Sequence, residues 1–182
     1  MQPINKTFET SRGIINIRAA LSSDVTQFRE LRLTALQDSP TAFSADYQTH
    51  LSHPMSFWED RLKLDEHGTI FFAEHAEHLI AMMGIRIGQS VKTKHSADIW
   101  GVCVHPEWRG LHIAEALIDA CVNWAEVRQV EMLKLGVTTT NLSAVRCYER
   151  SGFTTYGTDP RALFYEGKYY DEYLMSRSLD NS

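Results

Sequence analysis

The chain has 182 residues, 43% of them apolar, and this length and composition fit one domain with a sizeable core. Its 18 Lys and Arg residues against 23 Asp and Glu residues give a formal net charge of -5, without any Lys/Arg run. This balance argues against a nucleic-acid partner or an anionic membrane surface, but a local basic pocket for a phosphorylated ligand remains compatible with it.

The three cysteines, Cys103, Cys121 and Cys147, lie in apolar segments without CxxC spacing, so we expect buried reduced thiols and no metal site. Residues 1–13 are polar and contain no apolar signal core, and no segment reaches membrane-spanning length. We therefore expect a cytoplasmic protein without a membrane partner. Residues 1–182 should form a single domain, with residues 1–13 as a flexible extension.

Periodicity, caps and breakers predict the elements of the first half in chain order. These are a strand over residues 14–18, a helix from 22 or 23 to about 36, a partly ordered loop over 41–53, a helix from about 55 to 64, a hairpin of strands 69–74 and 79–87, and a third strand over 97–104.

The second half is predicted to alternate helices and strands. A helix should follow Gly110 to about residue 128, then a strand over 132–137, a helix over 142–151 capped by Asn141 and stopped by Gly152, and strands over 154–157 and 169–179 joined by a segment with Pro160. Strands in succession followed by this alternation imply an α/β (α+β) fold, with a mixed central sheet flanked by helices.

Residues 102–114 read as a strand, a tight turn through Pro106, Arg109 and Gly110, and the start of a helix. Such a turn directs unpaired backbone N–H groups and the positive end of a helix dipole to one point, where a pyrophosphate can bind. An ordinary strand-to-helix connection would have the same pattern.

Residues 104–114, VHPEWRGLHIA, resemble the acyl-CoA-binding signature of the GCN5-related N-acetyltransferases (GNAT family), in which Arg or Gln, two residues, Gly, one residue, and Gly or Ala follow one another. A stretch downstream resembles a second motif of that family through Asn141, Ala144, Tyr148, Gly152 and Phe153. Residues 31–43 also resemble a recurrent opening among members whose amine substrates are undefined.

The resemblance implies a single GNAT-like domain that moves an acetyl group directly from acetyl-CoA to a primary amine of a small molecule or protein. Its partners would be acetyl-CoA, as co-substrate, and the amine acceptor, and a homodimer is possible. The alternative is a CoA-binding regulatory or interaction module with weak or no catalysis, or an enzyme that transfers another acyl group.

The same resemblance assigns the donor site. Val102, Cys103 and Val104 would pair their backbone with the pantetheine arm, and the N–H of Val102 would reach the thioester oxygen. The pyrophosphate would lie on the backbone of Arg109, Gly110, Leu111, His112, Ile113 and Ala114. Asn141, beside Ala144, would hydrogen-bond the pantetheine, cap its helix, or do both.

Tyr148 falls at the family's general-acid position, where a phenol of pKa around 10 can protonate a departing thiolate of pKa around 8.5. A tyrosine that only packs at the rim of a helix is the alternative. Asp98 is the candidate general base, with Glu74 and His105 as weaker choices and an ordered water as a possible relay.

His112 departs from the family pattern, because it stands where the middle glycine of the pyrophosphate loop usually lies. A helical conformation does not require glycine there, and in it the side chain would point outward or contact phosphate. Weakened CoA binding is the other outcome.

The acceptor wall is expected from residues 43–58 and from a late loop over 158–170. Aromatic side chains there would line an amine pocket or complete the core: Phe43, Phe57, Trp58, Phe164 and Tyr165. Glu59, Asp60 and Asp159 would attract a cationic amine or form solvated surface charges.

Overall fold

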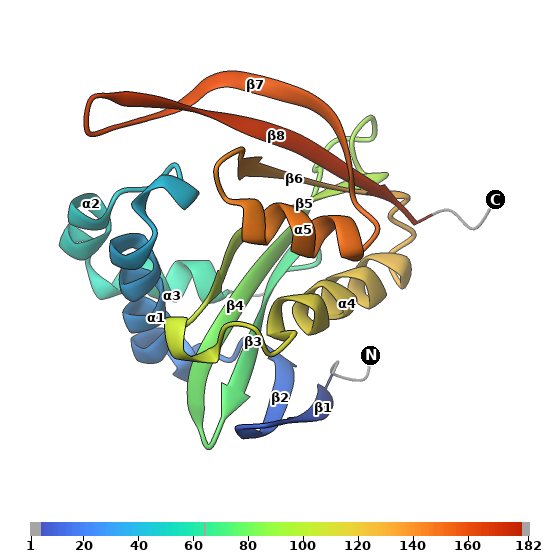
Figure 1. Cartoon of the computed structure of the whole chain (residues 1–182). Helices are drawn as coiled ribbons and strands as arrows, with labels where there is room; N and C mark the ends of the chain where they lie inside the picture. The colour runs from blue at the N-terminus through green and yellow to red at the C-terminus, as the bar shows by residue number, and fades with distance from the viewer. Residues whose placement is uncertain (1–4, 64, 180–182) are drawn as a thin grey trace.

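A twisted mixed sheet of eight strands, with helices on both faces, organises the part of the chain that the computed structural model describes, residues 5–63 and 65–179 (Figure 1). The strands are β1 (Asn5–Thr10), β2 (Gly13–Ala19), β3 (Gly68–His75), β4 (His78–Ile87), β5 (Ser96–Val104), β6 (Met132–Thr138), β7 (Thr154–Tyr165) and β8 (Lys168–Ser178). The α-helices are α1 (Val25–Asp38), α2 (Tyr47–Ser52), α3 (Met55–Leu62), α4 (Ile113–Glu126) and α5 (Leu142–Arg150), and three short 3-10 turns cover Ser22–Asp24, Pro40–Ala42 and Pro106–Trp108.

The strand order is β1-β2-β3-β4-β5-β6-β8-β7, and only the β5–β6 pair is parallel. This confirms the predicted mixed sheet. The hairpin predicted between β3 and β4 is also present, with Ala76 and Glu77 both at positive φ, as the tightest hairpin turns require. Among the described residues, no helix is long and apolar enough to cross a membrane.

Apolar side chains fill both faces of the sheet. Along β3 they alternate, so that Phe71 packs in the cluster beneath α4 while Phe72 packs in the opposite cluster beneath α1 and α3. Phe28 and Trp58 supply the largest rings of the second cluster and meet edge to face at 5.4 Å. Covered faces on both sides explain why β3 and β4 are nearly continuous apolar runs.

The amino-terminal segment corrects one expectation. Residues 5–10 do not form a flexible extension but the edge strand β1, which pairs antiparallel with β2. Phe8 packs on the core below α4, and Lys6 forms a 3.2 Å ion pair with Asp119 of that helix. The strand is otherwise polar, as an exposed edge tolerates, which leaves little apolar periodicity to detect. Residues 1–4 lie outside the described part of the chain.

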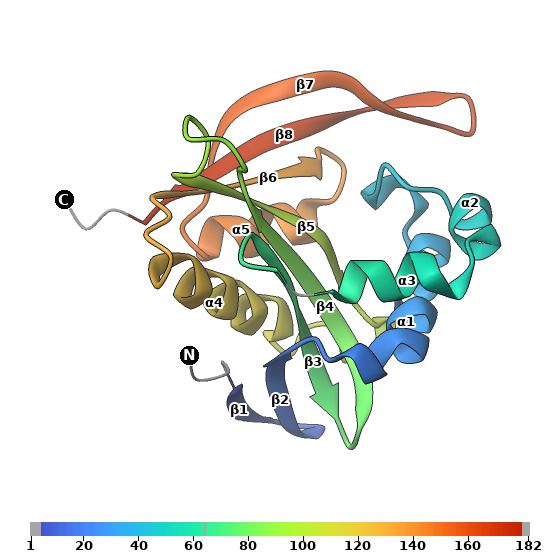
Figure 2. The ribbon, with the colours of Figure 1, turned by 180° about the vertical axis from the view of Figure 1, so that it is seen from behind.

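The carboxyl-terminal strands correct a second expectation from the sequence. The loop expected over residues 158–170 is a β-hairpin in which Leu163 pairs with Tyr170, and it extends over the region of α2 (Figures 1 and 2). Pro160 is accommodated where the register shifts between Asp159 and Leu163 on this edge strand. The expected loop over 41–53 likewise contains α2, which Asp46 caps by accepting from Thr49 N–H at 2.9 Å.

One buried ion-pair network joins the start of the fold to the sheet. Arg18 of β2 donates from Nη1 and Nη2 to the Asp24 carboxylate at 2.7 and 2.9 Å, and from Nε to Glu74 at 2.7 Å. Asp24 is only 4% exposed, so its charge depends on this partner. Hydrogen bonding to Asp24 raises the pKa of Arg18, against the opposing effect of burial.

We expect Arg18→Met to lower the free energy of unfolding by about 2–4 kcal/mol, because it leaves the buried Asp24 carboxylate unpaired. Urea denaturation measures this loss. Lys6→Met, which breaks an exposed ion pair, is the control and should cost less than about 1 kcal/mol. Equal losses in the two variants would show that burial of the network does not matter.

Candidate active site

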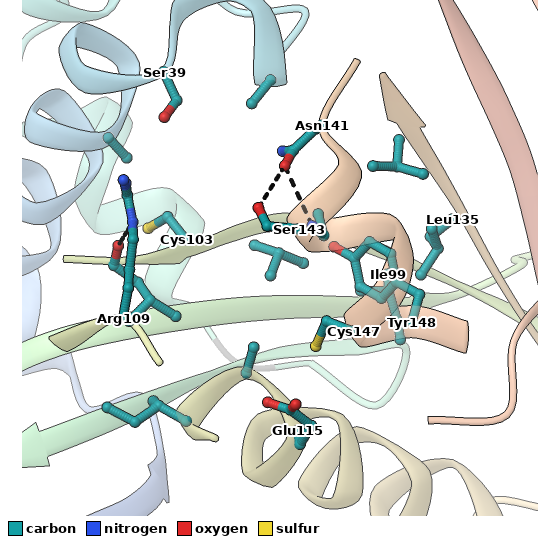
Figure 3. A pocket seen from close by; sticks show the side chains of 18 of the residues that line it. Ser39, Ile99, Cys103, Arg109, Glu115, Leu135, Asn141, Ser143, Cys147 and Tyr148 are labelled. Atoms are coloured by element: carbon teal, nitrogen blue, oxygen red, sulfur yellow. Dashed lines mark hydrogen bonds between the residues drawn. The ribbon is translucent and has the colours of Figure 1, made fainter. Parts of the chain in front are cut away.

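A cleft of about 510 Å³ opens where two neighbouring strands separate. β5 and β6 pair only from Ser96–Met132 to Asp98–Lys134. Beyond that point β6 stays with β8, while residues 99–104 of β5 and 135–137 of β6 line the two walls of the cleft, which α5 and the start of α4 complete (Figure 3).

A bulge shapes the β5 wall. Cys103 pairs with Met82 and Trp100 with Gly84, so that Gly101 and Val102 together oppose the single residue Met83. Gly101 has a φ of +65°, a conformation that glycine adopts without strain. Such a bulge leaves one residue outside the regular ladder and redirects the backbone, here at the residue expected to offer its N–H.

The predicted strand–turn–helix follows directly. After the 3-10 turn Pro106–Trp108, Gly110 takes a φ of +78° and α4 begins at Ile113, so the amino-terminal end of a 14-residue helix lies against the cleft. The unpaired amides and positive dipole end of such a helix favour an anion. This geometry fits the expected pyrophosphate site.

His112 does not have a helical conformation, the one in which glycine would not be required. Its φ of +58° and ψ of +22° lie in the left-handed region, which a glycine would occupy with less strain. Its imidazole points outward, with 77% of the side chain exposed, and Nδ1 lies 3.2 Å from Glu115 Oε1. The missing glycine therefore costs backbone energy, but no side chain fills the turn.

Arg109 fixes the turn to two other segments. Its Nε donates to the carbonyl oxygen of Val104 at 3.2 Å, and its Nη2 donates to the carboxylate of Asp38 at the end of α1. The hydrogen bonds from Arg109 and Ser39 hold the pKa of Asp38 below its usual range, so the pair stays charged. The guanidinium itself lines the cleft.

Asn141 is a helix cap that also faces the cleft. Its Oδ1 accepts from Ala144 N–H at 3.3 Å and from the Ser143 hydroxyl at 3.1 Å (Figure 3). The capping role is therefore present. The side-chain amide nitrogen makes no hydrogen bond within the described part of the chain, which leaves it able to donate to a ligand.

Tyr148 is 5% exposed and lies beside Ile99, with its hydroxyl turned toward the middle of the cleft (Figure 3). Phe153 packs edge to face on its ring at 5.9 Å. Burial, reinforced by Cys147 and Cys121, raises the pKa of Tyr148, so the phenol keeps its proton over the working pH range. Its hydroxyl has no hydrogen-bond partner among the described residues.

Sequence reasoning missed an ion-pair bridge across the cleft rim. Arg150 of α5 donates to Glu115 Oε1 of α4 at 2.7 Å. Partial burial opposes the charge of Glu115, but hydrogen bonds from Arg150 and His112 outweigh it and lower the pKa of Glu115. Arg146 also lines the cleft. The only sequence feature that indicated this ion pair was the i, i+3 spacing of His112 and Glu115, because Arg150 lies 35 residues from Glu115 in the chain.

The structure brings most of the expected donor residues together. All of them line the cleft except Leu111, whose side chain packs on the core. All three cysteines are unbonded and buried, as predicted, and burial raises the pKa of Cys103, on the cleft wall, to about 11.

The candidate bases and the acceptor wall are placed differently. Asp98, Glu74 and His105 do not line the cleft: Asp98 is exposed and Glu74 holds Arg18. Of the aromatic candidates, only Phe43 lines it, whereas Trp58 is fully buried and Phe164 is 63% exposed near the tip of the hairpin. Phe57 packs beside Trp58 at 5.3 Å, Tyr165 ends β7, and the three acids Glu59, Asp60 and Asp159 are exposed.

Solved acetyltransferases share this fold. A GNAT-family acetyltransferase from Streptococcus pneumoniae superimposes with a TM-score of 0.78 at 21% identity, covering 91% of this chain and 99% of that one. The putative acetyltransferase yncA from Salmonella typhimurium, in a structure with its cofactor acetyl-CoA, gives 0.76 at 17% identity over 92% and 95%. A ribosomal-protein-alanine N-acetyltransferase from Brucella melitensis gives 0.74 at 20% identity over 90% and 99%.

The sequence comparison identifies the family. The acetyltransferase (GNAT) family model matches residues 31–153, more than half of the chain and the whole of the cleft's β5, turn, α4, β6 and α5. The protein therefore belongs to the GNAT acetyltransferase family. No curated protein sequence matches the chain.

His112→Gly should raise the free energy of unfolding by about 0.5–1 kcal/mol, because glycine relieves the left-handed strain and Arg150 still pairs with Glu115. Urea unfolding measures the change. Lys92→Gly, in an exposed loop and without a positive φ, is the control and should lose stability through the greater entropy of its unfolded chain. An equal loss in both variants would mean that the backbone strain at His112 contributes no measurable free energy.

Proposed function

We propose that the protein transfers an acetyl group from acetyl-CoA directly to a primary amine of a small molecule or protein. The observation that carries this proposal is the buried Tyr148, whose unpartnered hydroxyl faces the cleft lined by the β5 bulge and the anion-binding turn. We place the reaction in the cytoplasm, in keeping with three unbonded cysteines.

The residues at the donor end fit the chemistry of acetyl-CoA. The backbone from Arg109 to Ala114, at the start of α4, would hold the pyrophosphate, and Arg146 adds positive charge to the cleft, whereas the charge of Arg150 is paired with Glu115. Residues 102–104 would pair with the pantetheine arm, assisted by the amide of Asn141. Bound there, acetyl-CoA supplies an activated thioester to the amine.

Val102 is our candidate for polarising the thioester carbonyl. The bulge at Gly101 and Val102 takes one residue out of the ladder with β4, which leaves a backbone N–H able to point into the cleft. A fixed N–H donor aimed at the oxygen where negative charge develops lowers the barrier without reorganisation.

Tyr148 would protonate the departing thiolate. A phenol is a weaker acid than a thiol in water, but the proton is delivered to a thiolate that is forming in a site shielded from water. Because burial raises the pKa of Tyr148, the proton is present throughout the neutral range and is not lost to solvent.

Tyr148→Phe should lower kcat about 100-fold with acetyl-CoA and a reactive amine, because it removes the acid and keeps the ring. Free-thiol release across an amine panel measures kcat, and calorimetry measures acetyl-CoA binding, which should not change. Tyr156→Phe, at a residue 58% exposed on β7, is the control. Full turnover in Tyr148→Phe would remove the acid from this mechanism.

Asp98 would accept the amine proton through a relay of water, since its exposed side chain lies outside the cleft. In the Asp98→Asn variant, kcat/KM should then fall less steeply as the pH is lowered than it does in the wild type. An unchanged pH profile would eliminate Asp98 and leave solvent as the proton acceptor.

A CoA-binding module without useful catalysis is the second candidate, favoured by the strained His112 at the turn. Acetyl-CoA binding without thiol release from any amine would support it. If acetyl-CoA is inert but propionyl- or succinyl-CoA releases thiol, the enzyme transfers another acyl group.

A further inference from the structure

A buried guanidinium that forms no ion pair with any described residue lies behind the ring of Phe43, which lines the cleft. Arg32 of α1 is only 9% exposed, and its Nη1 makes no hydrogen bond within the described residues. Its Cζ lies 4.1 Å from the centre of the Phe43 ring. Burial lowers the pKa of Arg32, so the fold disfavours a charge that it does not pair. The contact with Phe43 offsets only part of this cost.

Two further basic groups on neighbouring helices interact electrostatically with Arg32. His50 of α2 has a buried Nδ1 without a hydrogen-bond partner among the described residues, and Arg61 of α3, an exposed residue, lies with its Cζ 4.4 Å from the Phe57 ring. Burial, and then the charges of Arg32 and Arg61, lower the pKa of His50. We refer to Arg32, His50 and Arg61 as the basic cluster.

A third unpartnered donor borders the basic cluster. The ring of Trp58 lies 5.7 Å from that of His50, and its buried Nε1 makes no hydrogen bond in the described part of the chain. Arginine and indole nitrogens only donate hydrogen bonds, so both need an acceptor. No described carboxylate lies within ion-pair distance of the cluster: Asp46 caps α2 and Asp60 pairs with Lys63 at 2.6 Å.

The basic cluster lies behind the part of the cleft wall that Phe43 and Cys103 form, and none of its three residues lines the cleft itself. Phe43, which covers Arg32, lines the cleft, and so does Cys103, on whose thiol Arg32 acts electrostatically. The helices α1, α2 and α3 that carry the cluster lie together on the far side of the sheet from α4 (Figures 1 and 2). The cluster thus lies next to Phe43, the one expected acceptor-wall aromatic that lines the cleft.

We propose that the acceptor is an amine that carries a carboxylate, and that the basic cluster binds this carboxylate beside Phe43. The inference rests on the proposed amine acetylation and specifies its substrate class. A planar carboxylate accepts several hydrogen bonds at once and supplies the negative charge that the two guanidinium groups lack. A polyamine would add positive charge to an unpaired cationic site, and is disfavoured.

The test compares amines that differ only in the carboxylate. The full chain is assayed for thiol release with acetyl-CoA and alanine, phenylalanine or 4-aminobutyrate, each against its carboxamide. Aminomethylphosphonate and spermidine complete the panel. For the amino acid of the panel with the highest kcat/KM, we expect this value to be at least about tenfold higher than for its own carboxamide. The amides are the weaker bases and present more neutral amine, so reactivity alone would favour them.

Arg32→Met should abolish this preference. Methionine fills the buried space without charge, and the variant is expected to fold. Arg29→Met, on the same helix, is the control, because Arg29 reaches only the carbonyl of Leu51 at 3.4 Å. A wild type that turns over acid and amide equally, an Arg32→Met variant that keeps the preference, or a preference for the phosphonate would overturn the carboxylate site and leave amine acetylation intact.

A binding measurement separates this inference from the proposed function. If acetyl-CoA releases no thiol with any amine, the proposed acetylation is rejected. The carboxylate site is then tested separately through the indole ¹H–¹⁵N resonance of Trp58. In the presence of CoA, 4-aminobutyrate should shift this resonance, whereas its carboxamide and the Arg32→Met variant should give no shift. Absence of any shift in the wild type would overturn the site.

Discussion

The separation of β5 from β6 is the constraint on which the rest of the site depends. Parallel pairing ends at Asp98–Lys134, because β6 continues along β8 while β5 follows β4. Two adjacent strands that part in this way leave backbone groups and an apolar gap that no third strand can fill. The bulge at Gly101, the turn at Gly110 and the cap at Asn141 all lie along this gap, and each places backbone N–H groups or side-chain amides at its edge.

The donor half of the site could be predicted from sequence because its parts are local. The turn depends on Gly110 and the helix that follows, and α5 depends on the cap at Asn141 and on Gly152 beyond its end. Such short-range patterns record backbone geometry directly. Tyr148 then follows from its position on the capped helix. What the turn did not reveal is the left-handed conformation of His112, since a non-glycine residue there favours the opposite expectation.

The acceptor half depends on contacts that sequence spacing does not show. Arg32, His50 and Arg61 lie on three helices, and none of these residues belongs to a recognisable pattern. Asp98 was placed on the right strand, but it alternates with Ile99, and Ile99 is the residue that faces the cleft. β1 is polar apart from Phe8, and β7 carries register shifts between Thr155 and Gly157 and between Asp159 and Leu163, so neither strand has the regular apolar alternation that marks a half-buried strand.

The distribution of charge links the two halves chemically. Although the chain carries a net charge of -5, Arg109, Arg146 and Arg150 line the cleft and Arg32 lies behind its acceptor wall. On our proposal the first group faces the phosphates of the donor, with Arg109 and Arg150 held in place by Asp38 and Glu115. On our assignment Arg32, with Arg61 beside it, holds one carboxylate, which leaves one guanidinium charge in excess. A nearby positive charge lowers the pKa of an amine. More of the acceptor would therefore be neutral and nucleophilic when it meets the thioester. That effect reduces the demand on a general base, and it offers a physical reason why none of the candidate bases, Asp98, Glu74 and His105, needs to line the cleft.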